Sequence, residues 1–486
     1  MRKHVSFLAA ALLSALTLPA QIVLPGPGKY VATVSVKVYV SGKLTNYKGE
    51  MYLIDPVTLK AQPLTVPALA KQVGFNSITA VSPVTGYLTT IDGRPSANPK
   101  SGGDLYRYIL AGTRVTLVKL NTKPFTGGNL AQVAQVGSDL YLCTQDASGK
   151  AGLLWSVPAG GGAPKLIVDF GKLTGYAGLA NGLAALGGKI YVATWPYGQP
   201  LGCQLWEYDP ATKTAAKVMD LPKGLYTTYI YPVHITVDKA GKRLIVVGLY
   251  RDIVCIDPVT KKVTQYHAGN IRSSTMRPYY YKMLNSGVFN PDTGDVWTGT
   301  RAGGVDAFTG SHGVLDLVPG VGTSPTAAYN SVTGITYFPS GARTATYGNG
   351  GLGSPATSTY RFWPANLNLG YPIAGKKFGF HLNNATGGAP SILLLGVSKT
   401  SWAGIPLPFD LGPFGAPGNY LRCSAQTFVP FTASGSGPGK GKADFLISSV
   451  PSAAKGYTLY SQWMILDKGA NNLGIVMTNA RESLVQ

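Results

Sequence analysis

One histidine lies in a sequence context that could place it at a catalytic centre. His234 sits in the run Val233-His234-Ile235-Thr236-Val237-Asp238, a pattern typical of the innermost strand of a repeated β-unit. Innermost strands of such units line a central channel, where an imidazole could act as a general base. A hydrogen-bonded structural histidine fits the same pattern. We therefore keep His234 as the one candidate catalytic residue.

Aromatic and arginine side chains gather in three segments that we expect to be loops on one rim of the channel. The segments are residues 195–200, 226–231 and 272–281. Aromatic faces with polar edges suit sugar rings, peptides or a protein partner, and Tyr and Arg are enriched at the dominant positions of interfaces. Some of these tyrosines could instead pack in the core. The candidate ligand-binding residues are Trp195, Tyr197, Tyr229, Tyr231, Arg272, Arg277, Tyr279 and Tyr280.

Other kinds of chemistry find little support in the sequence. Asn290, Asp292 and Asp295 have the oxygen ligands of a calcium loop, but a bidentate Glu does not follow at its end, and the segment fits a hairpin turn. The chain contains no Gly-x-Ser-x-Gly motif. The small number of acidic residues argues against a glycosidase with two carboxylates. We predict no metal and no cofactor.

The chain repeats with a period of about 50 residues. Three copies contain a short strand followed by an Asp-Pro-x-Thr turn, at residues 55–58, 209–212 and 257–260. Pro fixes φ for the turn, and the Asp side chain bonds back to the backbone around it. When weaker copies are included, the equivalent positions are 52, 106, 155, 206, 254, 305 and 360.

Each repeat is predicted to contain four strands, because a second hairpin recurs upstream of most of these turns. Four-stranded units of this length are typical of propeller blades, which must stack on their neighbours and close into a ring. We predict an all-β chain with a seven-bladed propeller over residues 21–367, or a six-bladed one if the copy at Tyr360 is spurious. The N-terminal strand at residues 30–40 would close the ring.

The repeats resemble those of secreted bacterial propellers of the YVTN and NHL types. The resemblance covers about residues 30–366 and lies in the V/I-x-x-I-D-P-x-T hairpins and the apolar inner strands. It implies a fold more than a function, because that group includes binding proteins, lactonases and lyases. Propeller lactonases hold a metal with Glu, Asn and Asp on inner strands, and neither Glu50 nor Glu207 occupies such a position here.

The C-terminal region, residues 368–486, lacks the repeated hairpins. Its short strands predict a small β-sandwich. It resembles a module that recurs at the C-terminus of secreted bacterial proteins, through Trp402-x-Gly404-x-Pro406 and Gly415-x-Pro417-Gly418. In that module a Cys follows the second glycine, whereas Asn419 stands there in this chain. The resemblance implies an attachment or carbohydrate-contacting role.

The first 20 residues predict a secretory signal peptide. A basic head is followed by an apolar stretch, residues 5–18, and by a small residue at the expected cut, Ala20. That stretch is shorter than the roughly 20 residues of a membrane span, and no later stretch is apolar for long enough. We therefore predict a secreted protein, extracellular, periplasmic or at the cell surface, without a transmembrane segment.

The charge and the cysteines add two further expectations. The net charge is +21, but the basic residues are spread along the chain, which favours acidic surfaces or polymers over specific nucleic-acid binding. Cys143, Cys203, Cys255 and Cys423 are widely separated. They could form disulfides in any of three pairings, or be buried free thiols.

These features favour a secreted, non-catalytic binding protein. It would use one propeller face to hold a polysaccharide, a peptide or a protein partner, which could be acidic. The alternative is a propeller enzyme, a lactonase-like hydrolase or a polysaccharide lyase, acting at the channel mouth. The oligomeric state stays open.

Overall fold

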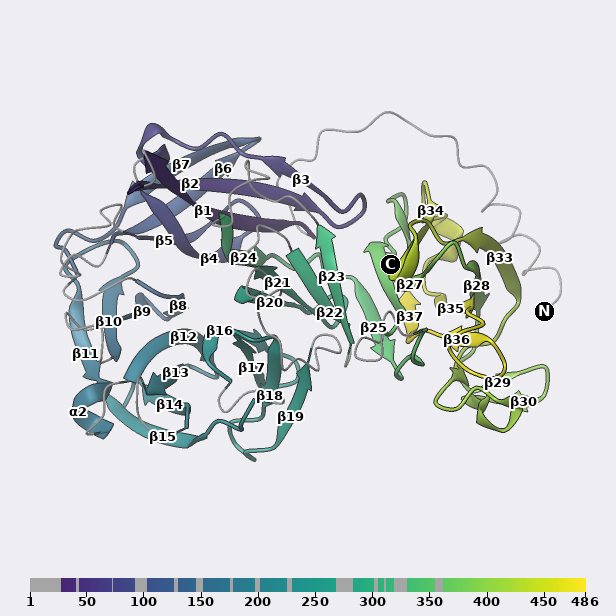
Figure 1. Cartoon of the computed structure of the whole chain (residues 1–486). Helices are drawn as coiled ribbons and strands as arrows, with labels where there is room; N and C mark the ends of the chain where they lie inside the picture. The colour runs from purple at the N-terminus through teal and green to yellow at the C-terminus, as the bar shows by residue number, and fades with distance from the viewer. Residues whose placement is uncertain are drawn as a thin grey trace.

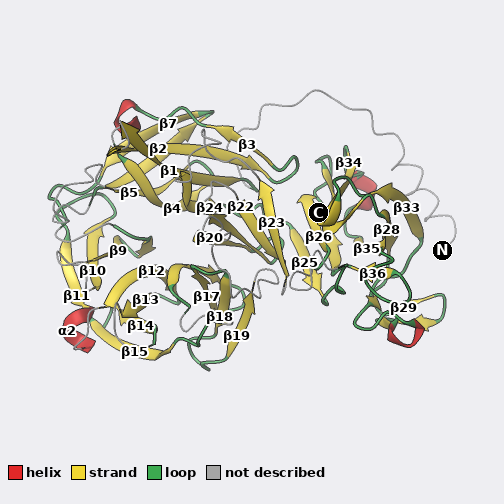
Figure 2. Ribbon diagram, viewed as in Figure 1, coloured by secondary structure: helices red, strands yellow, loops and turns green. Residues whose placement is uncertain are grey.

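The computed structural model describes residues 28–354 and 362–486, apart from residues 41–42, 72, 92–102, 126–129, 146–151, 175–177, 197–201, 225–229, 268–282, 301–304, 310–311 and 319–329. The expected signal peptide at residues 1–20 lies outside the described residues. The described chain is nearly all strand, with one α-helix, α2 (Phe170–Thr174), and the 3-10 turns η1 (Ala68–Lys71), η3 (Gly412–Phe414) and η4 (Ser452–Ala454) (Figure 2). The predicted all-β class is confirmed.

The larger part of the molecule is a ring of four-stranded antiparallel sheets (Figure 1). The first three sheets are β24 (Asn330–Tyr337), β1 (Tyr30–Val40), β2 (Lys43–Asp55) and β3 (Lys60–Pro63); β4 (Gly74–Ser82), β5 (Thr85–Ile91), β6 (Leu105–Ala111) and β7 (Arg114–Lys119); and β8 (Val133–Val136), β9 (Asp139–Gln145), β10 (Gly152–Pro158) and β11 (Lys165–Asp169).

The other three sheets follow in chain order with the same arrangement. They are β12 (Gly178–Leu186), β13 (Lys189–Pro196), β14 (Gln204–Asp209) and β15 (Thr214–Asp220); β16 (Pro232–Asp238), β17 (Arg243–Gly248), β18 (Asp252–Ile256) and β19 (Val263–His267); and β20 (Leu284–Asn290), β21 (Asp295–Thr300), β22 (Val305–Thr309) and β23 (His312–Val318).

The Asp-Pro-x-Thr turns join the third and fourth strands of three sheets, as their sequence predicts. In each turn the Asp Oδ1 accepts the backbone N–H two residues further on, at 2.8–2.9 Å (Asp55, Asp209 and Asp257). The fifth residue of each turn is left-handed, with φ of 54°, 60° and 58° (Leu59, Lys213 and Lys261). The Asp therefore stabilises the same tight turn in each of these repeats.

The first strand of every sheet faces the centre of the ring. β24, β4, β8, β12, β16 and β20 contact one another in that order, and β20 contacts β24 again. β24 pairs with β1, from Tyr337 opposite Tyr30 to Asn330 opposite Val36. The last strand of the ring thus completes the sheet that the N-terminal strands begin, and the two ends of the repeat region are joined.

The described ring contains six sheets, whereas the count of landmarks predicted seven blades. The seventh landmark, Tyr360, falls outside the described residues. The strands on either side of it, β25 (Arg343–Tyr347) and β26 (Ala365–Gly370), pair with strands of the C-terminal domain. The number of sheets differs from the number of landmarks because β1 and β24 lie in the same sheet as Tyr52. These two strands therefore do not form a seventh sheet.

Side-chain to backbone hydrogen bonds connect the inner strands. Thr333 Oγ1 donates to Phe75 O at 2.6 Å and joins β24 to β4, and Thr79 Oγ1 donates to Val133 O at 2.8 Å and joins β4 to β8. Further round the ring, Thr236 Oγ1 accepts the N–H of Phe289 at 2.9 Å. These bonds satisfy buried backbone groups at the sheet boundaries, while apolar side chains of adjacent sheets pack together outside them.

The smaller part of the molecule is a β-sandwich, as predicted. One sheet contains β25, β37 (Ala480–Leu484), β35 (Thr458–Leu466), β28 (Pro390–Gly396) and β33 (Thr427–Thr432), with β36 (Ile475–Met477) paired to β35; the other contains β26, β27 (Phe378–Gly387) and β34 (Gly437–Ile447). Two short hairpins, β29 (Ser401–Trp402) with β30 (Ile405–Pro406) and β31 (Phe409–Asp410) with β32 (Tyr420–Leu421), lie between β28 and β33 in the sequence. Phe380, Leu393 and Trp463 are fully buried in the core that the two sheets share.

The turn at residues 290–295 joins the ring to the sandwich. Asp292 Oδ2 accepts the Tyr337 hydroxyl at 2.5 Å and the Ser340 N–H at 2.6 Å. Both carboxylate oxygens of Asp295 accept Arg481 Nη2, at 2.8 and 2.9 Å, and both side chains are buried. The segment is the hairpin turn that the sequence predicts, between β20 and β21, and it is also a buried connection between the two parts.

The strand pairing also bears on the boundary between the propeller and the sandwich, which the sequence predicts between residues 367 and 368. That position falls inside β26, and β25 already pairs with β37. We propose that the boundary lies between Tyr337 and Arg343.

Within the described residues, no helix is long and apolar enough to cross a membrane. None of the four cysteines forms a disulfide, and all four are buried.

Candidate functional site

The inner strands carry a β-bulge near the start of nearly every sheet. In β4, β12, β16, β20 and β24 the pairing register shifts by one residue close to the end of the strand where the chain enters the sheet. A bulge leaves one residue out of the ladder and re-aims its side chain. The residues concerned are Asn76, Asn181, Val233, Asn285 and Thr333.

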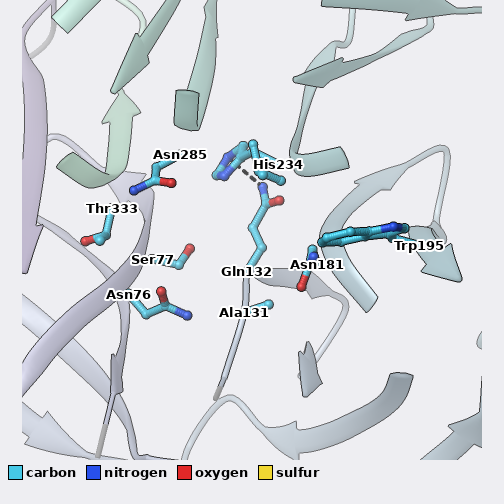
Figure 3. A pocket seen from close by; sticks show the side chains of 10 residues that line it. Asn76, Ser77, Ala131, Gln132, Asn181, Trp195, His234, Asn285 and Thr333 are labelled. Atoms are coloured by element: carbon cyan, nitrogen blue, oxygen red, sulfur yellow. Dashed lines mark hydrogen bonds between the residues drawn. The ribbon is translucent and has the colours of Figure 1, made fainter. Parts of the chain in front are cut away.

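These bulge residues line a cavity at the centre of the ring. The cavity has a volume of about 300 Å³, and Ala131, Ser77, Gln132, His234 and Trp195 complete its described lining. Figure 3 shows Asn76, Ser77, Thr333 and Asn285 on one side of it and Asn181 with Trp195 on the other. None of these ten residues carries a charge at neutral pH, so the polar groups of the described wall are amides, hydroxyls, one indole and one neutral imidazole.

The three asparagines come from alternate sheets. They lie about 105 residues apart in the chain, which is two repeats, and Ala131, Val233 and Thr333 stand at the intervening places. Asn76 donates to the carbonyl of Leu130. Within the described part of the chain, the buried Ser77 hydroxyl has no hydrogen-bond partner, and the Asn181 amide lines the same cavity. Donors and acceptors are therefore available to a ligand in the cavity.

Gln132 is the most extensively bonded side chain of the site. Its Oε1 accepts the N–H groups of Leu183 and Ile235, at 3.0 and 2.9 Å. Because these backbone donors determine which end of the amide is the oxygen, Nε2 must be the donor. Nε2 donates to Ile235 O at 2.5 Å and lies 2.9 Å from His234 Nε2. Gln132 thereby joins its own strand segment to β12 and to β16.

His234 lies at the cavity, where the sequence places it, but its surroundings oppose proton uptake. It is buried, and desolvation lowers its pKa to about 3. Its Nε2 accepts the Gln132 amide, so the imidazole is neutral and carries its proton on Nδ1. A base with so low a pKa is poorly matched to neutral pH. The catalytic role of His234 stays a prediction, and the geometry favours a structural role.

Trp195 and Tyr231 are the predicted rim residues that the structure describes. Trp195 lies at the end of β13 and lines the cavity. Tyr231 packs edge-on against it, with ring centroids 4.8 Å apart, and Tyr250 packs against Tyr231 at 5.2 Å. The other rim candidates lie outside the described residues: Tyr197, Tyr229, Arg272, Arg277, Tyr279 and Tyr280.

The amide residues of the cavity are not among those predicted from the sequence. Asn76, Asn181, Asn285 and Gln132 precede or begin apolar strands, where each one alone is unremarkable. The available signal was the recurrence of the three asparagines at the same place in alternate repeats. No group of three His, Cys, Asp or Glu side chains in the described ranges is placed to hold a metal ion.

Comparisons with known proteins give likenesses to solved structures only. The chain matches no model of a known protein family and no curated protein. It is similar to a structure of a nidogen/laminin complex, with 12% identity, a TM-score of 0.41, and coverage of 63% of this chain and 97% of that one. It is also similar to a putative 6-phosphogluconolactonase from Bacteroides uniformis, with 15% identity, a TM-score of 0.37, and coverage of 57% and 78%.

A third similar structure is the extracellular domain of a putative hybrid two-component system from B. thetaiotaomicron. The identity is 11% and the TM-score is 0.38, and the match covers 76% of this chain and 45% of that one. At such identities the likenesses concern the fold alone.

Proposed function

We propose that the protein is a secreted, non-catalytic binding protein that holds a neutral carbohydrate at the mouth of the propeller channel. The observation that carries this proposal is the wall of the cavity, in which neutral amides and hydroxyls face a single indole. Sugar hydroxyls both donate and accept hydrogen bonds, as amides do. The apolar face of a sugar ring suits an aromatic face such as that of Trp195.

The charge of the wall decides between classes of ligand. An ion that leaves water for a site without an opposite charge loses its hydration without compensation. The described wall offers no such charge, so a neutral polyol fits it better than a uronate or a phosphate. The high positive charge of the whole chain would instead give a weaker attraction to acidic polymers, and that attraction would fall with salt.

The same wall argues for binding without turnover. His234 is the only titratable side chain among the ten described lining residues, and its pKa is about 3. General acid–base catalysis needs a group whose pKa lies near the working pH. A lactonase-like or lyase activity would therefore have to use residues other than these ten.

The test is a titration of the mature protein with neutral glucans, mannans and galactans, with reducing ends and unsaturated products measured in the same samples. We expect saturable binding without products. Trp195→Ala should weaken it about tenfold or more, because the loss of a buried aromatic contact is worth about 1.4 kcal/mol or more. Trp402→Ala is the matched control, because Trp402 lies in the sandwich and lines no part of the cavity. Product formation would contradict the proposal, as would equal binding by both variants.

A further inference from the structure

The described wall of the cavity is built by the whole ring. Its residues come from β4, the segment before β8, β12 with β13, β16, β20 and β24, so all six sheets contribute. Neighbouring inner strands are in contact all the way round. A cavity of this kind is enclosed at its sides, and a ligand enters it along the axis of the ring. It differs from a groove, which a polymer can cross from one side to the other.

Gln132 further limits the space within the ring. It comes from the segment before β8 and bonds to β16, and the sheet that contains β12 lies between these two. A side chain that joins sheets which are not neighbours must pass inside the strand between them. Gly182 of β12 permits this close packing, because a Cβ there would lie 2.8 Å from Ile235 Cγ1 and 3.1 Å from the backbone of His234. The channel is thus narrowed beside the cavity.

The cavity has room for a sugar unit. Its volume is about 300 Å³, many times the space that one water molecule needs. A single sugar ring with a few waters therefore fits in it. The Asn181 amide and the unpartnered Ser77 hydroxyl both lie within this one compartment.

We infer that the site recognises the end of a neutral glycan chain and takes up one terminal sugar residue. This inference rests on the proposed function and deepens it. An internal stretch would have to thread through the ring along its axis, past the part of the channel that Gln132 narrows, whereas a terminal residue can enter from one side. The number of binding sites on a polysaccharide is then its number of ends, not its number of sugar units.

The experiment compares long and short forms of the same polymer. Linear neutral glucan, mannan and galactan are each used intact and as a partial hydrolysate at the same mass concentration, with the matching free monosaccharide as competitor. We expect the half-saturating mass concentration to be proportional to the mean chain length, so that it is lower for the hydrolysate than for the intact polymer. The free monosaccharide should compete with both for the site. Asn181→Ala should weaken binding about tenfold in every arm, and Asn472→Ala, at an exposed position of the sandwich, should leave it unchanged.

The outcomes separate the two proposals. If binding is about tenfold weaker in Asn181→Ala but the half-saturating mass concentration is independent of chain length, the site holds an internal stretch. End recognition is then wrong while the proposed function stands. If none of the polymers or monosaccharides binds, both proposals are overturned.

Discussion

At the scale of single residues, the site depends on a histidine that is held neutral. His234 is buried, accepts a hydrogen bond from Gln132, and has a pKa of about 3. In the unfolded chain the same imidazole has a pKa of about 6.5. The unfolded state therefore binds a proton that the folded state excludes. The stabilisation due to the neutral imidazole is complete above pH 6.5 and is lost as the pH falls toward 3.

His234→Gln should remove this dependence, because Gln does not titrate and can still accept the Gln132 amide. Between pH 6 and pH 4 the free energy of unfolding of the wild type should fall more steeply than that of the variant, by up to about 1.4 kcal/mol per pH unit. Urea denaturation at a series of pH values measures both slopes. Equal pH dependence of the free energy of unfolding in the two proteins would contradict this account, because His234 would then take up its proton in the folded protein.

The amides of the cavity show where prediction from the sequence stops at this scale. The histidine and the tryptophan were found because their residue types are rare and chemically distinctive. Asn76, Asn181 and Asn285 were not, because a bulge shifts the alternation of a strand by one residue. Which side chain then faces the channel depends on the pairing partner, and the strand's own sequence does not record it.

At the scale of elements, the inner strands are held together by polar side chains as well as by apolar packing. Gln132 alone satisfies the N–H groups of Leu183 and Ile235 and the carbonyl of Ile235. A buried backbone group left without a partner costs about 1–3 kcal/mol. The side chain therefore links three sheets at the wall of the cavity.

Gln132→Ala should lower the free energy of unfolding by about 3 kcal/mol or more, because it leaves three backbone groups without that partner. Gln135→Ala is the matched control. Gln135 lies in β8, three residues after Gln132, but is exposed, so we expect a change within about 0.5 kcal/mol. Chemical denaturation of both variants measures the difference. Similar stabilities for the two would show that water replaces the Gln132 side chain at no cost.

The elements themselves could largely be predicted. The Asp-Pro-x-Thr turns have a local cause, a proline and a carboxylate that bonds to nearby N–H groups, and they appear where expected. The sheet to which β24 belongs could not be predicted from local sequence in this way. Its partner β1 lies some 300 residues away in the chain, and nothing in residues 330–337 alone specifies which sheet they join.

At the scale of the whole molecule, the ring and the sandwich share a buried polar joint. Arg481 of β37 is fully buried and holds both carboxylate oxygens of Asp295 in the ring. Its other nitrogens donate to the carbonyls of Thr293 and Asn366. Charges are buried in this way only when they are paired and hydrogen-bonded. The two parts are therefore expected to unfold together.

Arg481→Ala should lower the free energy of unfolding by about 3–5 kcal/mol, because it leaves Asp295 buried without its partner. Glu482→Ala is the neighbouring control. Glu482 pairs with Lys399 at the surface, and such pairs are worth about 1 kcal/mol or less. Calorimetry should show one transition in the wild type and two in Arg481→Ala. A single unshifted transition in Arg481→Ala would mean that the joint contributes little to the coupling.

The central claim is that a neutral site inside the ring, rather than the positive surface, holds the ligand. The most direct measurement is the dissociation constant for a neutral glycan, with wild type and Asn181→Ala compared at low and at high salt. We predict that the constant is the same at both salt concentrations, and that Asn181→Ala raises it about tenfold through the loss of neutral hydrogen bonds. A constant that rises with salt and is equal in the two proteins would contradict the claim and place binding on the charged surface.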